Sequence, residues 1–154
     1  MNNQKIRQDI FKFLKSHGIM TLAAYSKEPW VCTVYYGVDD QMNIYIVTNP
    51  NSKHGKYIAN YPNVAFAIFD SHTKVTDQKE GLQGQGICTM IEKQEEVVRA
   101  LKIWHQANPG IESRITPEAV KKWPDTKLYK IRPTQIKFYN DKLYGKKEYA
   151  LLDL

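Results

Sequence analysis

Residues 48–54 form the segment of this sequence best suited to bind an anion. The segment reads Thr-Asn-Pro-Asn-Ser-Lys-His, so it places two hydroxyl groups and one fixed positive charge within seven residues. Ser52 is of a residue type that caps helix starts, and a short helix is expected from there through Asn60. A helix start offers free backbone N–H groups and a partial positive charge, which favour a phosphate group. The simpler alternative, in which Ser52 only caps the helix and Lys53 only faces solvent, stays open.

Strands and helices on both sides must position this segment. Ile6, Ile10, Phe13 and Leu14 recur at helical spacing and predict a helix over residues 5–17. After Gly18 the pattern changes to the period of a strand, and residues 20–24 form a short apolar run. Six strands are expected, at residues 30–38, 43–48, 64–69, 81–91, 127–131 and 135–139. Helical spacing returns over residues 92–106, and Thr116-Pro117 predicts the start of another short helix.

Six strands joined by turn-length connections, with few helices, predict an α+β protein that is mainly β. We expect a six-stranded antiparallel barrel with flanking helices, because closing a sheet removes its exposed edges. Residues 94–123 are expected to form a helical insertion that either covers the mouth of an active site or only packs on the barrel, and Trp104 and Trp123 favour packing. The chain shows no internal repeat and no linker, so residues 1–154 are expected to form one domain.

The composition excludes several classes of protein. Charged residues make up 25% of the 154 residues and apolar residues 42%, which is ordinary globular usage. The two cysteines predict no disulfide framework, and the four scattered histidines predict no metal site. No apolar run approaches the length of a membrane span, and the first residues lack a signal-peptide core. We therefore expect a soluble, cytoplasmic protein.

The net charge of +6 is spread along the chain. It fits either ordinary surface solvation or an anionic partner. The sequence contains no long basic run, so nucleic acid is a minor alternative.

The order of several short motifs resembles a known family. A strand is followed by Thr-Asn-x-x-Ser-Lys, a short helix, Asn-x-Pro-Asn-Val and another strand. This order is similar to that of the FMN-binding split barrels of the pyridoxamine 5′-phosphate oxidase-like superfamily. Residues 79–86, 136–140 and 145–147 also resemble its YhbP-like branch. The resemblance covers roughly residues 19–149.

The resemblance implies a homodimer with FMN bound at the subunit interface. Thr48, Ser52 and Lys53 would then hold the phosphate, and His54 stands where a second basic residue often occurs. Residues 33–36 would run beside the flavin ring, and Trp30 would reach the same pocket. The cofactor-binding residues so implied are Thr33, Val34, Tyr35, Tyr36, Val47, Thr48, Ser52, Lys53, His54 and Gln83. For Trp30 and Tyr36, plain packing in the core or the interface is the open alternative.

The sequence also departs from the family pattern. Val31 and Tyr36 stand where the oxidase carries basic residues, which leaves Lys53 and the helix start to bind the phosphate. Arg132 is the last arginine and His105 the last histidine, whereas the oxidase grips its substrate with a later Arg and His. Pyridoxamine phosphate oxidase activity is therefore not expected, and neither is haem ligation through a C-terminal histidine.

Three functions remain as hypotheses. The first is an FMN-dependent oxidoreductase of unknown substrate, in which the flavin N5 exchanges a hydride. The second is a non-catalytic flavin carrier or redox sensor. The third is a small basic barrel that binds nucleic acid through exposed aromatic residues. No catalytic residue stands out, and the residues do not distinguish FMN from a deazaflavin.

Overall fold

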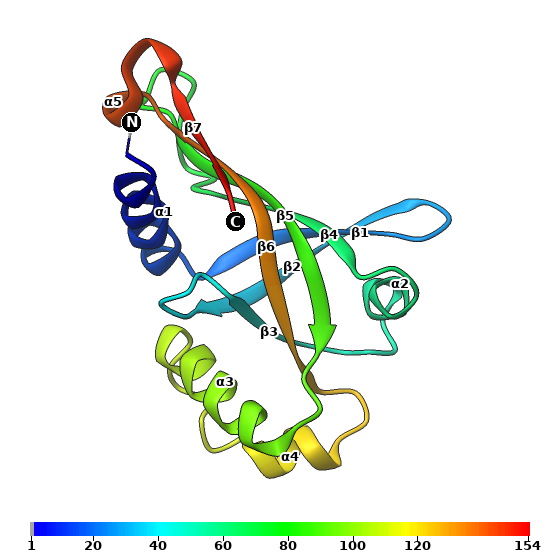
Figure 1. Ribbon diagram of the computed structural model, residues 1–154. Helices are drawn as coiled ribbons and strands as arrows, with labels where there is room; N and C mark the ends of the chain where they lie inside the picture. Colours follow the sequence, from blue (N-terminus) through cyan, green and yellow to red (C-terminus); the bar gives the residue numbers. More distant parts are fainter. Residues whose placement is uncertain (1) are drawn as a thin grey trace.

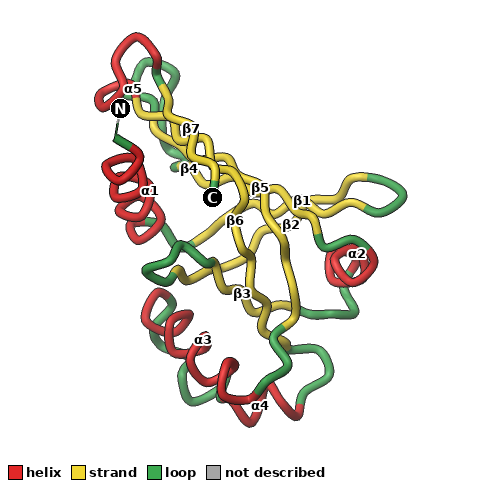
Figure 2. The backbone as a smooth tube through the Cα atoms, viewed as in Figure 1, coloured by secondary structure: helices red, strands yellow, loops and turns green. Residues whose placement is uncertain are grey.

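The computed structural model describes residues 2–154 and consists of seven antiparallel strands with helices around them. Figure 1 shows this arrangement, and Figure 2 shows the same backbone coloured by secondary structure. The elements are, in chain order, α1 (Asn3–Ser16), β1 (Ile19–Tyr25), β2 (Pro29–Val38), β3 (Ile44–Thr48), α2 (Lys53–Asn60), β4 (Asn63–Phe69), β5 (Glu80–Met90), α3 (Gln94–Ala107), α4 (Pro117–Lys122), β6 (Lys127–Asn140), α5 (Asp141–Tyr144), the 3₁₀ turn η1 (Gly145–Lys147) and β7 (Tyr149–Asp153).

Six of the strands close into a barrel, which confirms the predicted fold class. The strand order is β3-β2-β1-β4-β5-β6-β7, and β3 also pairs with β6, which closes the ring. Strand β6 is long enough to pair with two strands along the same edge. Its first half pairs with β3, with Ile131 opposite Ile44, and its second half pairs with β7, with Phe138 opposite Ala150. Strand β7 is therefore an addition outside the barrel.

The expectation of two separate closing strands was wrong, because residues 127–140 form one strand. The pairing of β5 with β6 shifts register between Gln85 and Gly86, so that Gly86 faces Pro133 while Thr134 has no opposite residue. Such a bulge accommodates a proline, which has no N–H to donate to the ladder. A Cβ atom on Gly86 would lie 2.5 Å from the carbonyl oxygen of Arg132, which accounts for the glycine. The final strand, β7, was not predicted.

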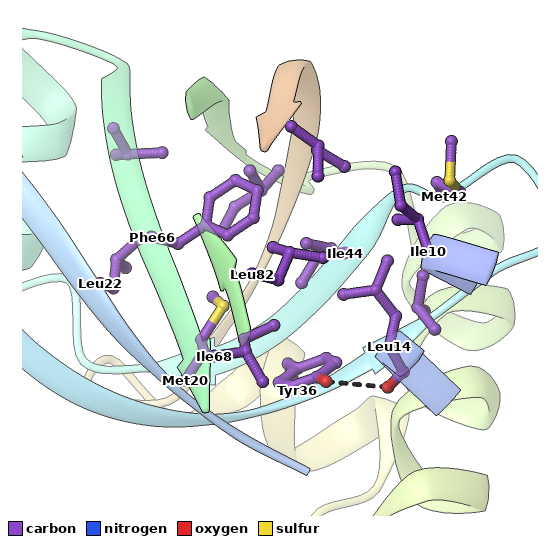
Figure 3. Packing of buried hydrophobic residues seen from close by; sticks show 14 of the residues in the cluster. Ile10, Leu14, Met20, Leu22, Tyr36, Met42, Ile44, Phe66, Ile68 and Leu82 are labelled. Atoms are coloured by element: carbon purple, nitrogen blue, oxygen red, sulfur yellow. Dashed lines mark hydrogen bonds between the residues drawn. The ribbon is translucent and has the colours of Figure 1, made fainter. Parts of the chain in front are cut away.

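The core fills the barrel and extends under α1. Ile10 and Leu14 of α1 are fully buried against residues of β1, β3 and β5 such as Leu22, Ile44 and Leu82. Figure 3 shows this packing and one polar contact within it. The hydroxyl group of Tyr36 donates a hydrogen bond of 2.8 Å to the carbonyl oxygen of Leu14. That carbonyl lies in the last turn of α1, where it has no partner within the helix.

The helical insertion packs on the barrel, as predicted. Leu101 and Trp104 of α3 and Val120 of α4 form a second buried cluster with Tyr45 and Leu128 of the barrel wall. Of the two tryptophans expected to pack, Trp104 is 4% exposed. The expectation for Trp123 was wrong, because that side chain is 42% exposed.

The cysteines lie in the barrel wall as free thiols. Cys32 is half-buried and Cys88 is buried. Burial raises the pKa of Cys32 to about 11 and that of Cys88 to about 12, so neither is a reactive thiolate near neutral pH. Across residues 2–154, no helix combines the length and apolar character needed to cross a membrane.

Candidate functional site

The start of α2 is capped as the sequence predicts. The Oγ atom of Ser52 accepts a hydrogen bond of 3.1 Å from the backbone N–H of Gly55. The same hydroxyl group donates its proton to the carbonyl oxygen of Asn49 at 2.6 Å. A serine hydroxyl has one proton, so this contact leaves Ser52 no proton for a ligand. Ser52 therefore shapes the helix start and the loop before it.

The backbone N–H groups of the first two helical residues remain free. Within residues 2–154, neither the N–H of Lys53 nor that of His54 makes a hydrogen bond. These are the positions at which a helix has no carbonyl of its own to bond. Free donors at this end, together with the helix dipole, suit a phosphate or another anion.

Gly55 lets the helix start pack directly against the preceding loop. A Cβ atom at this position would lie 2.5 Å from the carbonyl oxygen of Asn49 and 2.7 Å from the carbonyl group of Pro50. The backbone can approach this closely only because glycine has no side chain. The path of residues 49–52 around the helix start thus depends on Gly55.

His54 and Thr48 join the helix start to the end of β3. The Nε2 atom of His54 lies 2.6 Å from the Oγ1 atom of Thr48 and 3.1 Å from the Oγ atom of Ser52. Burial lowers the pKa of His54, so the ring is neutral at pH 7 and offers hydrogen bonding without charge. The predicted residues Thr48, Ser52 and His54 therefore form one hydrogen-bonded group.

The ammonium group of Lys53 is directed away from that group, toward the hairpin between β1 and β2. Its Nζ atom lies 2.6 Å from the Oε1 atom of Glu28 and 4.2 Å from the centre of the Trp30 ring. The hydroxyl group of Tyr57 also reaches Oε1 of Glu28, at 3.3 Å. The lysine is thus held by an ion pair and a cation–π contact at the edge of the helix start.

The barrel wall is split beside α2. Strand β2 pairs with β3 only from Tyr36 to Val38, whereas β1 pairs with β2 back to Pro29. The end of β3, Val47 and Thr48, pairs with β6 alone. The first half of β2 therefore presents an edge that faces no strand.

The free edge of β2 carries uncommitted backbone groups. The N–H of Tyr36 donates to the carbonyl of Gly18, next to β1. Because bonding alternates along an antiparallel strand, the backbone groups of Val31, Thr33 and Tyr35 face away from β1. The carbonyl of Tyr35 accepts a bond of 3.2 Å from the indole N–H of Trp104. The other groups of this edge are available to a ligand.

The remaining predicted residues lie apart from the α2 group. The side chains of Val34 and Tyr36 are buried in the core, and the backbone groups of both residues face β1. Gln83 is exposed on β5, opposite Ala67 of β4 and Lys137 of β6. Strands β1 and β4 separate it from β2, which corresponds to about 14 Å at the usual strand spacing.

Sequence reasoning missed Glu28 and Tyr57. Both become part of the site only because the β1–β2 hairpin folds back onto α2, a contact between residues far apart in the sequence. The available signal in the sequence is Ser26-Lys27-Glu28-Pro29, which is typical of a turn and places a charged side chain at the tip of a hairpin.

Comparison with family profiles decides the family. Residues 6–140 match the family described as pyridoxamine 5′-phosphate oxidase. The chain belongs to the pyridoxamine 5′-phosphate oxidase family. A search of curated protein sequences gave no match.

Solved structures share the split-barrel fold of this family. A heme-binding protein from Mycobacterium smegmatis has a TM-score of 0.74 and 17% identity, over 99% of this chain and 58% of that chain. The chain thus spans little more than half the length of that protein. General Stress Protein 26 from Bacillus anthracis has a TM-score of 0.69 and 18% identity, over 97% and 98% of the two chains. A protein of the pyridoxinephosphate oxidase family from Clostridium acetobutylicum, related to general stress protein 26, has a TM-score of 0.71 and 11% identity, over 100% and 97%. At these identities the likeness concerns the fold.

Proposed function

We propose that this protein binds FMN between the start of α2 and the free edge of β2, as a homodimer. The observation that carries the proposal is the pair of free N–H groups at Lys53 and His54, next to the split in the barrel wall. A phosphate and a planar heterocycle joined by a flexible chain need such a combination of a helix start and an open strand edge. Membership of the family supports the choice of flavin.

The phosphate end is assigned to the helix start. The free N–H groups of Lys53 and His54 donate to phosphate oxygens, and the hydroxyl group of Thr48 lies close enough to His54 to join them. The ammonium group of Lys53 supplies the fixed charge after a change of rotamer away from Glu28. Ser52 and Gly55 support the loop, with no direct contact from the Ser52 hydroxyl.

The ring end is assigned to the edge of β2. The pyrimidine part of a flavin carries both an N–H donor and carbonyl acceptors, which complement the N–H and C=O groups of Val31 and Thr33. The aromatic ring of Trp30, 42% exposed, is available for flat contact. When bound, FMN supplies hydride transfer at N5, and the residues named here bind and orient it.

The homodimer is supported by the outer face of the sheet. Ile19, Val31, Tyr35 and Phe69 are between 49% and 60% exposed on the adjacent strands β1, β2 and β4. Several large apolar side chains exposed on one face of a sheet are typical of an interaction site. Gln83 lies in the same row of this face as Ala67 and Thr21, so a second copy packed here would bring its own Gln83 into the interface.

The proposed activity is that of an FMN-dependent oxidoreductase, and the alternative is a flavin carrier or redox sensor without turnover. In this proposal the residues named above bind and orient the flavin, and none of them acts as a general acid or base. Reduction of the bound flavin by a nicotinamide donor would support the enzyme, whereas a flavin that no donor reduces would support the carrier.

A titration with FMN tests the binding proposal. The Lys53→Ala variant is expected to lose about 10- to 150-fold in FMN affinity, because it removes a charge-assisted hydrogen bond to the phosphate. Riboflavin, which lacks the phosphate, should bind both proteins alike. Unchanged FMN affinity in Lys53→Ala would contradict the phosphate assignment.

A further inference from the structure

Lys53 joins α2 to the β1–β2 hairpin through an ion pair with Glu28. Its Nζ atom lies 2.6 Å from the Oε1 atom of Glu28 and 4.2 Å from the centre of the Trp30 ring. The hydroxyl group of Tyr57 donates to the same carboxylate oxygen at 3.3 Å. Glu28 is thus bound by two groups of α2 although it belongs to the turn before β2.

The carboxylate of Glu28 presents oxygen atoms to Lys53 in the way that a phosphate group would. Both are oxyanions that accept hydrogen bonds from an ammonium group and a phenol. The hydrogen bond with Glu28 raises the pKa of Lys53, and the hydrogen bond with Lys53 lowers the pKa of Glu28, so both groups are charged at neutral pH. The ion pair is exposed, with 39% and 60% of the two side chains open to solvent, so it is weak enough to be exchanged.

We propose that Glu28 is an internal competitor that occupies Lys53 until a phosphate-bearing ligand displaces it. The inference rests on the proposed function, because it names what regulates the affinity of the same site. Glu28 is a positioning residue here: it holds Lys53 over Trp30 and sets the cost of releasing the lysine toward the helix start. A phosphate dianion attracts Lys53 strongly enough to offset the cost of releasing it from Glu28. A ligand without a phosphate does not need Lys53, so the ion pair does not affect its affinity.

The variant Glu28→Gln tests the assignment, because it keeps the size of the side chain and removes its charge. Exposed ion pairs are weak, so the variant should bind FMN about 1.4- to 5-fold more tightly. The gain should shrink as salt is added. Riboflavin affinity should not change. A merely structural role of Glu28 would not separate FMN from riboflavin in this way.

Two further variants isolate the pair. Glu148→Gln removes an equal charge from an exposed pair with Lys79, 3.4 Å long, and should leave FMN affinity unchanged. In the Lys53→Ala background, Glu28→Gln should have no effect, since the competitor then has no lysine to hold.

The possible results distinguish the role of Glu28 as a competitor from FMN binding itself. Tighter FMN binding by Glu28→Gln alone, lost in the double variant, supports the assignment. FMN binding by the unaltered protein with no gain in Glu28→Gln, or the same gain in Glu148→Gln or in the Lys53→Ala background, overturns the inference and leaves the proposed function standing. No FMN binding by the unaltered protein or any variant overturns both.

Discussion

Thr48 and His54 meet through a contact of 2.6 Å between Oγ1 and Nε2, although one ends β3 and the other lies in the first turn of α2. The contact ties the end of a barrel strand to the start of the helix across the loop that Ser52 and Gly55 shape. The free N–H groups of α2 are therefore fixed relative to the barrel wall. The backbone donors therefore need little reorganisation before they bind an anion, and only the side chain of Lys53 has to move.

Two substitutions at Ser52 should separate helix capping from anion binding. Ser52→Ala removes the cap on the Gly55 N–H and should lower the free energy of unfolding by about 1 kcal/mol. Ser52→Asp keeps a capping oxygen and should be the more stable of the two variants in urea denaturation. Its carboxylate would repel a phosphate, so FMN affinity should fall about tenfold or more below that of Ser52→Ala. The same order for stability and affinity would contradict a phosphate site here.

Gly55→Ala should destabilise the protein even though alanine favours helices. The new methyl group would collide with the carbonyl groups of Asn49 and Pro50, and overpacking of this kind costs about 1–3 kcal/mol. Gly18→Ala is the matched control, since no atom lies within 4 Å of a Cβ there. Thermal denaturation should show a lower Tm for Gly55→Ala and little change for Gly18→Ala. Equal Tm values would show that the loop before α2 moves freely.

The sequence predicted the barrel because its signals are local. The strand segments of β2 and β4, the Ser52 cap and the helical spacing of α1 are all readable within ten residues, and each is confirmed. Strand β6 was divided in the prediction because Pro133 normally ends a strand. The bulge that accommodates it depends on Gly86 of another strand.

The site was predicted less completely than the fold. The group of Thr48, Ser52 and His54 lies within seven residues and was found from sequence. The contacts of Lys53 with Glu28 and Trp30 span more than twenty residues and depend on how the hairpin folds back. The free edge of β2 consists of backbone groups, which have no signature in side-chain types.

Tyr36 should matter for stability and not for binding through its side chain. Tyr36→Phe removes the bond from its buried hydroxyl group to the carbonyl of Leu14. The free energy of unfolding should fall by about 0.5–1.5 kcal/mol or somewhat more, since the carbonyl is left buried. Tyr35→Phe, at a position 59% exposed, is the control and should change little. FMN affinity reduced by Tyr36→Phe at unchanged stability would place the hydroxyl group in the site.

His54 should make the folded state sensitive to mild acid. Its pKa is lowered by burial from the usual 6.5, so the unfolded chain takes up the proton more readily than the folded one. The contribution is fully present above about pH 6.5 and is lost as the pH falls through the lower pKa of the folded state. Urea denaturation of the His54→Gln variant between pH 8 and pH 5 should show a flatter pH dependence than the unaltered protein. An identical dependence would show that His54 is not the responsible group.

The most direct test of the account is the visible absorption spectrum of the purified protein after incubation with excess FMN and desalting. The account predicts a retained flavin spectrum at about one flavin per subunit, reduced or absent in Lys53→Ala. A protein that stays colourless, or one that takes up haem and no flavin, would contradict it.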